Sequence, residues 1–283
     1  MNRLSIVTAA LVPLALITAQ GASAAGPNIC LATAGKVQVQ MGSATCSATG
    51  KGSLAIAKGS NSSATAVGKN NQARATGENS LARALSNSSN RATASGDGSV
   101  AVAEEGSDNT ATASGDDSNA YAGQGNDNES VASGDGSSAT TQVSDRSTAR
   151  ASGDASVANA GFGDNNTATV SGDGSTASAG MANNNTAAAS GTESDAYAGE
   201  GGNNRARATA YGSAAYSYFG HGNIAVASGN GSIAQTDFAN YSSATASGIG
   251  SYAEAFNGDH ITAIAATNGC QITVEGSGQT GSC

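Results

Sequence analysis

The sequence lacks tryptophan and has only 2 prolines among its 283 residues. Aromatic residues make up 4% of the chain and charged residues 12%, against roughly 25% charged in ordinary globular domains. Large side chains are therefore too few to fill a deep core, and charges are too few for a charged disordered tail. The 12 Lys and Arg are outnumbered by 21 Asp and Glu, which excludes the basic patch that nucleic-acid binding requires. Small residues must do the packing.

The first residues are typical of a secretory signal peptide. Met1-Asn2-Arg3 carries one positive charge, Leu4 to Ile17 form an apolar run, and Ala22-Ser23-Ala24 resembles a cleavage site. A transmembrane anchor needs about 20 apolar residues, and no later apolar run has that length. We expect residues 1–24 to be removed, a mature chain that begins at Ala25 and has no transmembrane anchor, and an extracellular or cell-surface location.

The four cysteines lie near the two ends of the mature chain and not between them. An even number of cysteines in an exported chain favours disulfides. A bond across the molecule would require the ends to meet, whereas an elongated array holds them apart. We therefore predict the pairs Cys30–Cys46 and Cys270–Cys283, within end caps at 25–49 and 268–283. A metal site is the alternative, but no Cys-x-x-Cys spacing supports it.

A period of 19 residues runs through the middle of the chain. Serine recurs at every nineteenth position from Ser80 to Ser251, and alanine follows two places later, from Ala82 to Ala253. A second alternation of small residues lies half a repeat away, and between residues 50 and 77 the segments follow one another at a spacing of nine. The glycines that share the 19-residue step are Gly77, Gly96, Gly115, Gly134, Gly153, Gly172, Gly191, Gly229 and Gly248.

Each repeat holds two short segments with strict alternation, separated by Gly, Asn, Asp and Ser, which is typical of strands and turns. Ser99, Ala101 and Ala103 would share one strand face, and Val100 and Val102 the other. The invariantly small column must be the interior, and the variable column the outside. The sequence thus predicts an all-β fold, a flattened parallel β-solenoid of 19-residue, two-strand coils over 50–267, with an Ala/Ser core.

The two kinds of turn carry different polar residues. Gly-Asp-x-Ser turns, three of them Gly-Asp-Gly-Ser, place a carboxylate at five successive 19-residue steps, so stacked carboxylates would lie about 5 Å apart. Either these are solvated turn residues or calcium neutralises them, since acidic oxygens suit that cation. No other cofactor is expected. The column is Asp97, Asp116, Asp135, Asp154 and Asp173. The opposite turn repeats Asn71, Asn90, Asn109, Asn128, Asn166, Asn185, Asn204 and Asn223, which predicts a hydrogen-bonded amide ladder.

Aromatic residues gather on the outer side of the later repeats. The segment between residues 210 and 222 lacks the glycine that recurs at the 19-residue step. We therefore expect this segment to bulge and to present Tyr216, Tyr218 and Phe219 as a contact patch. Catalysis has little support: His221 and His260 are the only histidines, and no Gly-x-Ser-x-Gly elbow occurs. We expect that the protein is not an enzyme.

The segments Gly52-Ser53-Leu54-Ala55-Ile56 and Gly98-Ser99-Val100-Ala101-Val102 resemble the head repeats of trimeric autotransporter adhesins. This resemblance spans roughly residues 50 to 267 and implies a left-handed β-roll that trimerises and binds host matrix or cells. The Asn columns and Gly-rich turns also resemble curli-type fibre subunits, which implies self-assembly.

We therefore expect a secreted, non-enzymatic, structural or adhesin-like rod that presents a surface for cell-envelope, matrix or host contact. The partner would be a surface or matrix component that the sequence does not identify, and self-association is compatible with the pattern. The alternative is a self-assembling extracellular fibre or matrix subunit, stabilised by calcium if the Asp column binds it.

Overall fold

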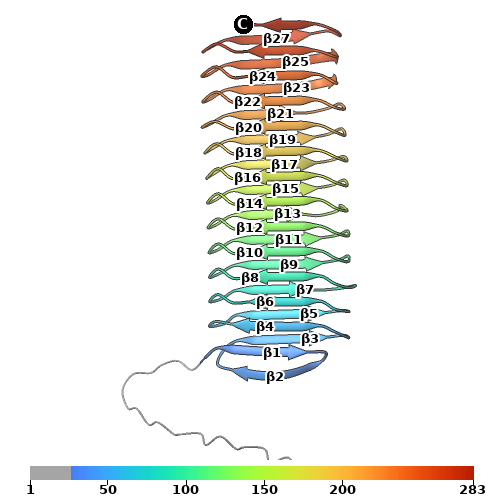
Figure 1. Ribbon diagram of the computed structural model, residues 1–283, viewed down its shortest axis with the longest axis vertical. Helices are drawn as coiled ribbons and strands as arrows, with labels where there is room; N and C mark the ends of the chain where they lie inside the picture. The colour runs from blue at the N-terminus through green and yellow to red at the C-terminus, as the bar shows by residue number, and fades with distance from the viewer. Residues whose placement is uncertain (1–26) are drawn as a thin grey trace, which may run out of the picture.

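The computed structural model describes residues 27–283, and the predicted signal peptide lies outside them. The chain winds into an all-β, parallel β-solenoid in which successive strands alternate between two sheets (Figure 1). The described residues contain no helix. The fold predicted from the 19-residue period is confirmed.

The two sheets contain 15 and 13 strands and are named sheet A and sheet B. Sheet A consists of β2 (Lys36–Met41), β1 (Ile29–Thr33), β4 (Leu54–Lys58), β6 (Gln72–Ala75), β8 (Arg91–Ala94), β10 (Thr110–Ala113), β12 (Glu129–Ala132), β14 (Thr148–Ala151), β16 (Thr167–Val170), β18 (Thr186–Ala189), β20 (Arg205–Ala208), β22 (Ile224–Ala227), β24 (Ser243–Ala246), β26 (Thr262–Ala265) and β28 (Thr280–Ser282). Sheet B consists of β3 (Thr45–Thr49), β5 (Ser63–Val67), β7 (Leu81–Ala84), β9 (Val100–Glu104), β11 (Asn119–Gly123), β13 (Ser138–Thr141), β15 (Val157–Gly161), β17 (Thr176–Gly180), β19 (Asp195–Gly199), β21 (Ala214–Ser217), β23 (Ile233–Asn240), β25 (Tyr252–Asp259) and β27 (Gln271–Glu275).

Parallel pairing keeps equivalent residues of successive coils side by side. Ala120 pairs with Ala139 in sheet B, for example, and Ala92 with Ala111 in sheet A. The first coils are one residue shorter, which accounts for the spacing of nine in the sequence: Thr45 pairs with Ser63. Because the register does not slip, each 19-residue column becomes a straight line of side chains along the rod.

The interior between the sheets is filled by methyl-sized groups, as predicted. Ala101 and Ala103 are fully buried, whereas Val100 and Val102 on the same strand remain partly exposed. The same alternation of buried and partly exposed positions recurs along both sheets. Side chains this small let the two sheets approach closely, and the packing leaves room for little more than a methyl group.

The asparagine column forms the predicted ladder, but the bonds join side chains to backbone and not amide to amide. The Asn90 backbone N–H donates to Asn71 Oδ1 at 2.9 Å, and Asn90 Nδ2 donates to the carbonyl of Gly106, in the next coil, at 2.7 Å. The asparagines of this column are among the largest fully buried side chains. Each one thus satisfies corner backbone groups that would otherwise be buried without partners.

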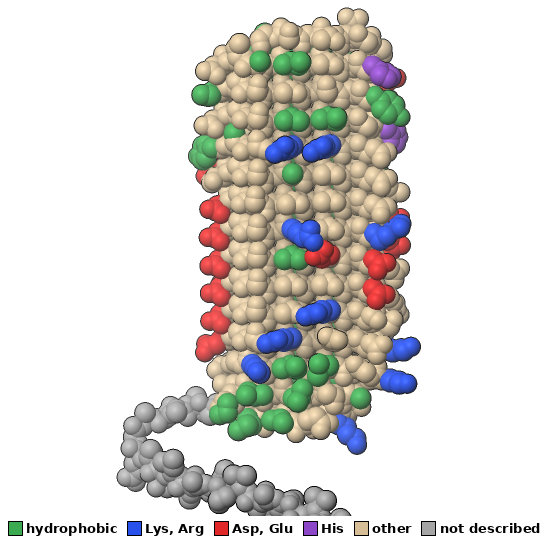
Figure 2. Space-filling view, in the orientation of Figure 1, with side chains coloured by type: hydrophobic (Ala, Val, Ile, Leu, Met, Phe, Trp, Pro, Cys, Tyr) green, Lys and Arg blue, Asp and Glu red, His purple; other side chains and the backbone are tan. Residues whose placement is uncertain are grey.

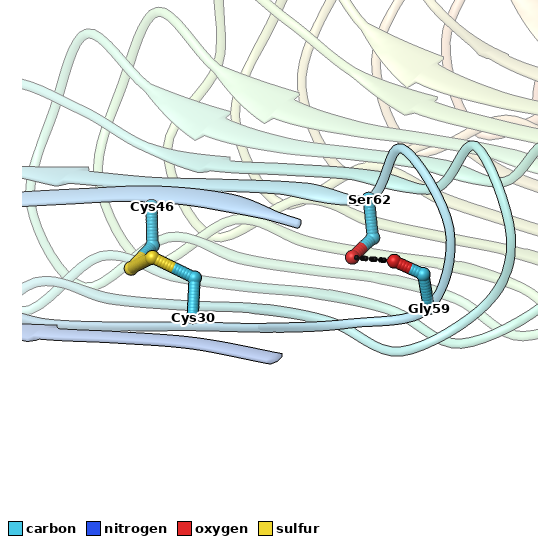
Figure 3. Close-up of a disulfide and its surroundings, with 4 residues drawn as sticks. All are labelled: Cys30, Cys46, Gly59 and Ser62. Atoms are coloured by element: carbon cyan, nitrogen blue, oxygen red, sulfur yellow. Dashed lines mark hydrogen bonds between the residues drawn. A yellow bond between two sulfur atoms is a disulfide. The ribbon is translucent and has the colours of Figure 1, made fainter. Parts of the chain in front are cut away.

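Both predicted disulfides are present. The Cα atoms of Cys30 and Cys46 are 5.5 Å apart, and those of Cys270 and Cys283 are 6.1 Å apart. The first bond joins β1 to β3 across the two sheets, one coil before the corner at which Ser62 Oγ donates to the Gly59 carbonyl (Figure 3).

The segments expected to be caps are partly built into the stack. The hairpin β1–β2 runs antiparallel to its neighbour β4 and closes sheet A at this end. In contrast, β3 pairs in parallel with β5, β27 with β25 and β28 with β26. The parallel stack therefore reaches beyond residues 50–267 at both ends.

Candidate contact surface

The outer face of sheet B gathers the aromatic side chains. Pairing of β17, β19, β21 and β23 puts Ser178, Tyr197, Tyr216 and Gln235 in one column. A second column lies beside the first, two residues further along each strand. It consists of Gly161, Gly180 and Gly199, followed by Tyr218 and Asp237. Two adjacent columns thus change from small to aromatic residues within one coil of each other.

Glycine makes room for the tyrosine rings on this face. A Cβ on Gly199 would lie 2.8 Å from the Tyr197 hydroxyl oxygen, and one on Gly123 would lie 2.8 Å from that of Tyr121. Neither glycine has a left-handed backbone conformation. Glycine is therefore required at these positions by the close approach of the tyrosine ring, and not by the backbone. The pattern Tyr-Ala-Gly in β11 and β19 is the sequence signal for a ring lying flat along the strand.

Three tyrosines pack together and are here called the tyrosine cluster: Tyr197, Tyr216 and Tyr218. The ring centroids of Tyr197 and Tyr218 are 4.9 Å apart, and those of Tyr216 and Tyr218 are 5.6 Å apart in a stacked arrangement. These distances are those of favourable aromatic pairs. The rings remain partly exposed, so the cluster offers a flat aromatic surface to solvent.

Phe219 does not join this cluster, although the sequence predicted a single patch with Tyr216 and Tyr218. It lies at the corner after β21, where its ring stacks on Phe238 at 4.7 Å. The expected bulge is also wrong, because β21 pairs in register with both β19 and β23. Gly212 stands in the column of Gly136 and Gly231 and has the same left-handed backbone, so the turn is intact.

Two carboxylates accompany the tyrosine cluster, and neither was predicted. Glu200 Oε2 and Asp237 Oδ1 are shielded from solvent and have no hydrogen-bond partner among the described residues. Burial raises the pKa of Tyr218 to about 12, and Asp237 and Glu200 act in the same direction. The strands of sheet B from β9 to β27 contain no Lys or Arg. The surface is thus aromatic, acidic and without a counter-charge of its own.

Asp237→Asn should stabilise the protein at pH 7. Burial, and then the charge of Glu254, raises the pKa of Asp237 above its ordinary value of 3.8. The native protein therefore holds this proton more tightly than the unfolded chain, and stability falls as the pH rises from 3.8 through the folded-state pKa. We expect a higher melting temperature for the variant at pH 7, and no gain once the pH is below 3.8.

The exposed side chain of Glu275 supplies the control, since Glu275→Gln removes one negative charge without relieving burial. A Glu275→Gln variant that gained as much as Asp237→Asn would show that net charge, and not burial at Asp237, sets the effect.

The acidic turn column has a structural role in this fold. Asp116 Oδ1 accepts the backbone N–H of Asp97 at 2.9 Å, and Asp135 Oδ1 accepts that of Asp116 at 3.0 Å. Asp97, Asp154 and Asp173 make the equivalent bonds. Figure 2 shows carboxylates in a line along one edge of the rod. Within residues 27–283 no three His, Cys, Asp or Glu side chains are grouped so that they could hold a metal ion; calcium binding stays a prediction.

The two histidines also lie in corners. His221 Nδ1 accepts the backbone N–H of Gly202 at 2.9 Å, and the His260 ring stacks on Tyr241 at 5.6 Å. Both contacts continue the column interactions between coils. The structure therefore gives each histidine a packing role.

Compared with protein-family models, curated proteins and solved structures, the chain matches none of them. In the part of the chain that the structure describes, no helix has the length and hydropathy needed to cross a membrane.

Proposed function

We propose that the protein is a secreted, non-enzymatic rod that makes extracellular contacts through the tyrosine cluster and its two carboxylates. The observation that carries this proposal is the cluster itself: stacked, partly exposed rings beside shielded carboxylate oxygens that lack partners. Exposed aromatic residues are enriched at binding interfaces, where they contribute large contact areas at low entropic cost. The surrounding columns are mostly small and polar, which concentrates the contact energy at this level of the rod.

The partner class is a component of the cell envelope, the extracellular matrix or a host surface. Two bonded cysteine pairs suit an oxidising compartment. The resemblance of the repeats to adhesin heads supports the same class, since a regular solenoid can carry varied side chains on an unchanging frame. Adhesion by a rod of this kind needs no reactive group, only a rigid display surface.

Loss of the tyrosine cluster should abolish this contact. We expect Tyr216→Ser/Tyr218→Ser to weaken retention of the oxidised protein on immobilised cell-surface and matrix preparations by at least about tenfold, because aromatic anchors dominate binding energy. The matched control is Tyr211→Ser/Tyr241→Ser, which removes two highly exposed tyrosines elsewhere. Equal losses in the two variants, or none in the first, would contradict the proposal.

A further inference from the structure

The two broad faces of the rod differ in charge. The outer side of sheet A carries exposed arginines, whereas sheet B from β9 onward has none and contains Glu104, Asp195, Asp237, Glu254 and Glu275. Figure 2 shows basic side chains over the middle of one broad face. Within residues 27–283 only Arg150 forms an ion pair, with Glu129 at 2.6 Å. The arginines of sheet A are Arg74, Arg91, Arg150, Arg205 and Arg207.

Arg205 and Arg207 lie at the level of the tyrosine cluster on the opposite side of the rod. Strand β19 ends at Gly199, and after one corner the chain returns as β20 from Arg205. Residues equally far from that corner lie back to back, so Arg205 is behind Gly199 and Arg207 behind Tyr197. Both arginines are exposed, and Ala206 between them points into the core.

A neighbouring rod placed alongside without axial shift would bring these groups together. Its Arg205 would reach the column of Gly199, Tyr218 and Asp237, and its Arg207 would reach Tyr197 and Tyr216. Arginine stacks on aromatic rings and donates to carboxylates, so it matches both features of this surface. The two arginines would bring positive charge to an acidic face whose strands from β9 to β27 contain no Lys or Arg of their own.

We propose that the tyrosine cluster also binds a second copy of this chain, which presents Arg205 and Arg207 of its sheet A. This inference rests on the proposed function, since it takes the tyrosine cluster as a contact surface. Each sheet B face is about 15 Å wide and about 60 Å long, or roughly 900 Å², against about 800 Å² per partner in standard interfaces. Two different faces meet, so the contact is heterologous and extends into an open row of parallel rods.

Sedimentation velocity of the oxidised protein tests this assembly. We expect the sedimentation coefficient to rise with concentration at low salt, and Arg205→Gln/Arg207→Gln to raise the dissociation constant at least about tenfold. The control Arg74→Gln/Arg91→Gln removes the same charge from the same sheet, far from the tyrosine cluster. A monomeric parent at all concentrations would overturn the proposal, as would equal weakening by both double variants. Circular dichroism confirms that each variant is folded.

Mixing two defective variants tests whether the contact is heterologous. Arg205→Glu/Arg207→Glu has an impaired sheet A face, and Tyr216→Ser/Tyr218→Ser has an impaired sheet B face without a charge that could pair with the new glutamates. Each should stay monomeric alone, whereas the mixture should form dimers that grow no further. Failure of the mixture to dimerise would overturn the face assignment. If the parent stays monomeric yet binds cell-surface material through its tyrosines, this inference fails and the proposed function stands.

Discussion

Gly134→Ala should destabilise the solenoid by about 3 kcal/mol, the upper end of the cost of overpacking. A Cβ at this position would lie 2.2 Å from the carbonyl oxygen of Gly153 and 2.5 Å from its carbonyl carbon. Both atoms belong to the backbone of the next coil, so no side chain can move aside. The corners would have to separate and lose hydrogen bonds between coils. Urea unfolding followed by circular dichroism measures the loss.

Gly136→Ala is the matched control, two residues away in the same turn. Nothing lies within 4 Å of the added Cβ, and the only cost is the left-handed backbone at a φ of 63°. Ala155 already occupies the equivalent position of the next coil with a φ of 51°. We expect a loss of about 1 kcal/mol. If the two variants lost equal stability, backbone conformation and not contact between coils would limit the turn.

Asn109→Ala should lower the free energy of unfolding by about 3 kcal/mol, because it leaves several buried backbone groups without hydrogen-bond partners at once. Asn109 is fully buried; its Nδ2 donates to the Gly125 carbonyl at 2.8 Å, and its Oδ1 accepts the N–H of Asn128 at 3.0 Å. After truncation neither group has a side-chain partner, and the N–H of Asn128 is buried away from water. We expect a lower urea midpoint and faster hydrogen exchange at the corners on either side.

Asn126→Ala provides the comparison from the exposed part of the same corner. Asn126 Oδ1 accepts the N–H of Ser107 at 3.0 Å, but this bond is exposed, so water can replace it. We expect a loss below about 1 kcal/mol. A similar loss for Asn109→Ala would mean that the buried ladder contributes no more than a surface turn.

A row of parallel rods would change how the protein makes contacts. One rod offers a single tyrosine cluster, whereas a row joins many rods and leaves one sheet B face free at its end. The last rod of the row can therefore still bind another surface through its tyrosine cluster. Lateral assembly and surface adhesion are therefore compatible in one molecule; sedimentation of the parent protein tests the first, and its retention on cell-surface material tests the second.

The period of 19 residues and the alternation of small residues were enough to predict the coils, the interior column and the asparagine ladder. In a register without slips, residues 19 apart must be neighbours, so their columns can be read directly from the chain. Cys30–Cys46 and Cys270–Cys283 followed from the length of the array. These features depend on backbone periodicity alone.

Contacts between columns depended on the three-dimensional arrangement. Tyr218 packs on Tyr197, 21 residues away, because Gly199 leaves space for the ring, while Phe219 turns onto Phe238 at the corner. The back-to-back placement of Arg207 and Tyr197 likewise follows from where the chain turns between β19 and β20. The period of the sequence defines which residues form a column along the rod. The orientation of the side chains and the space around them decide which columns contact one another and what surface they form.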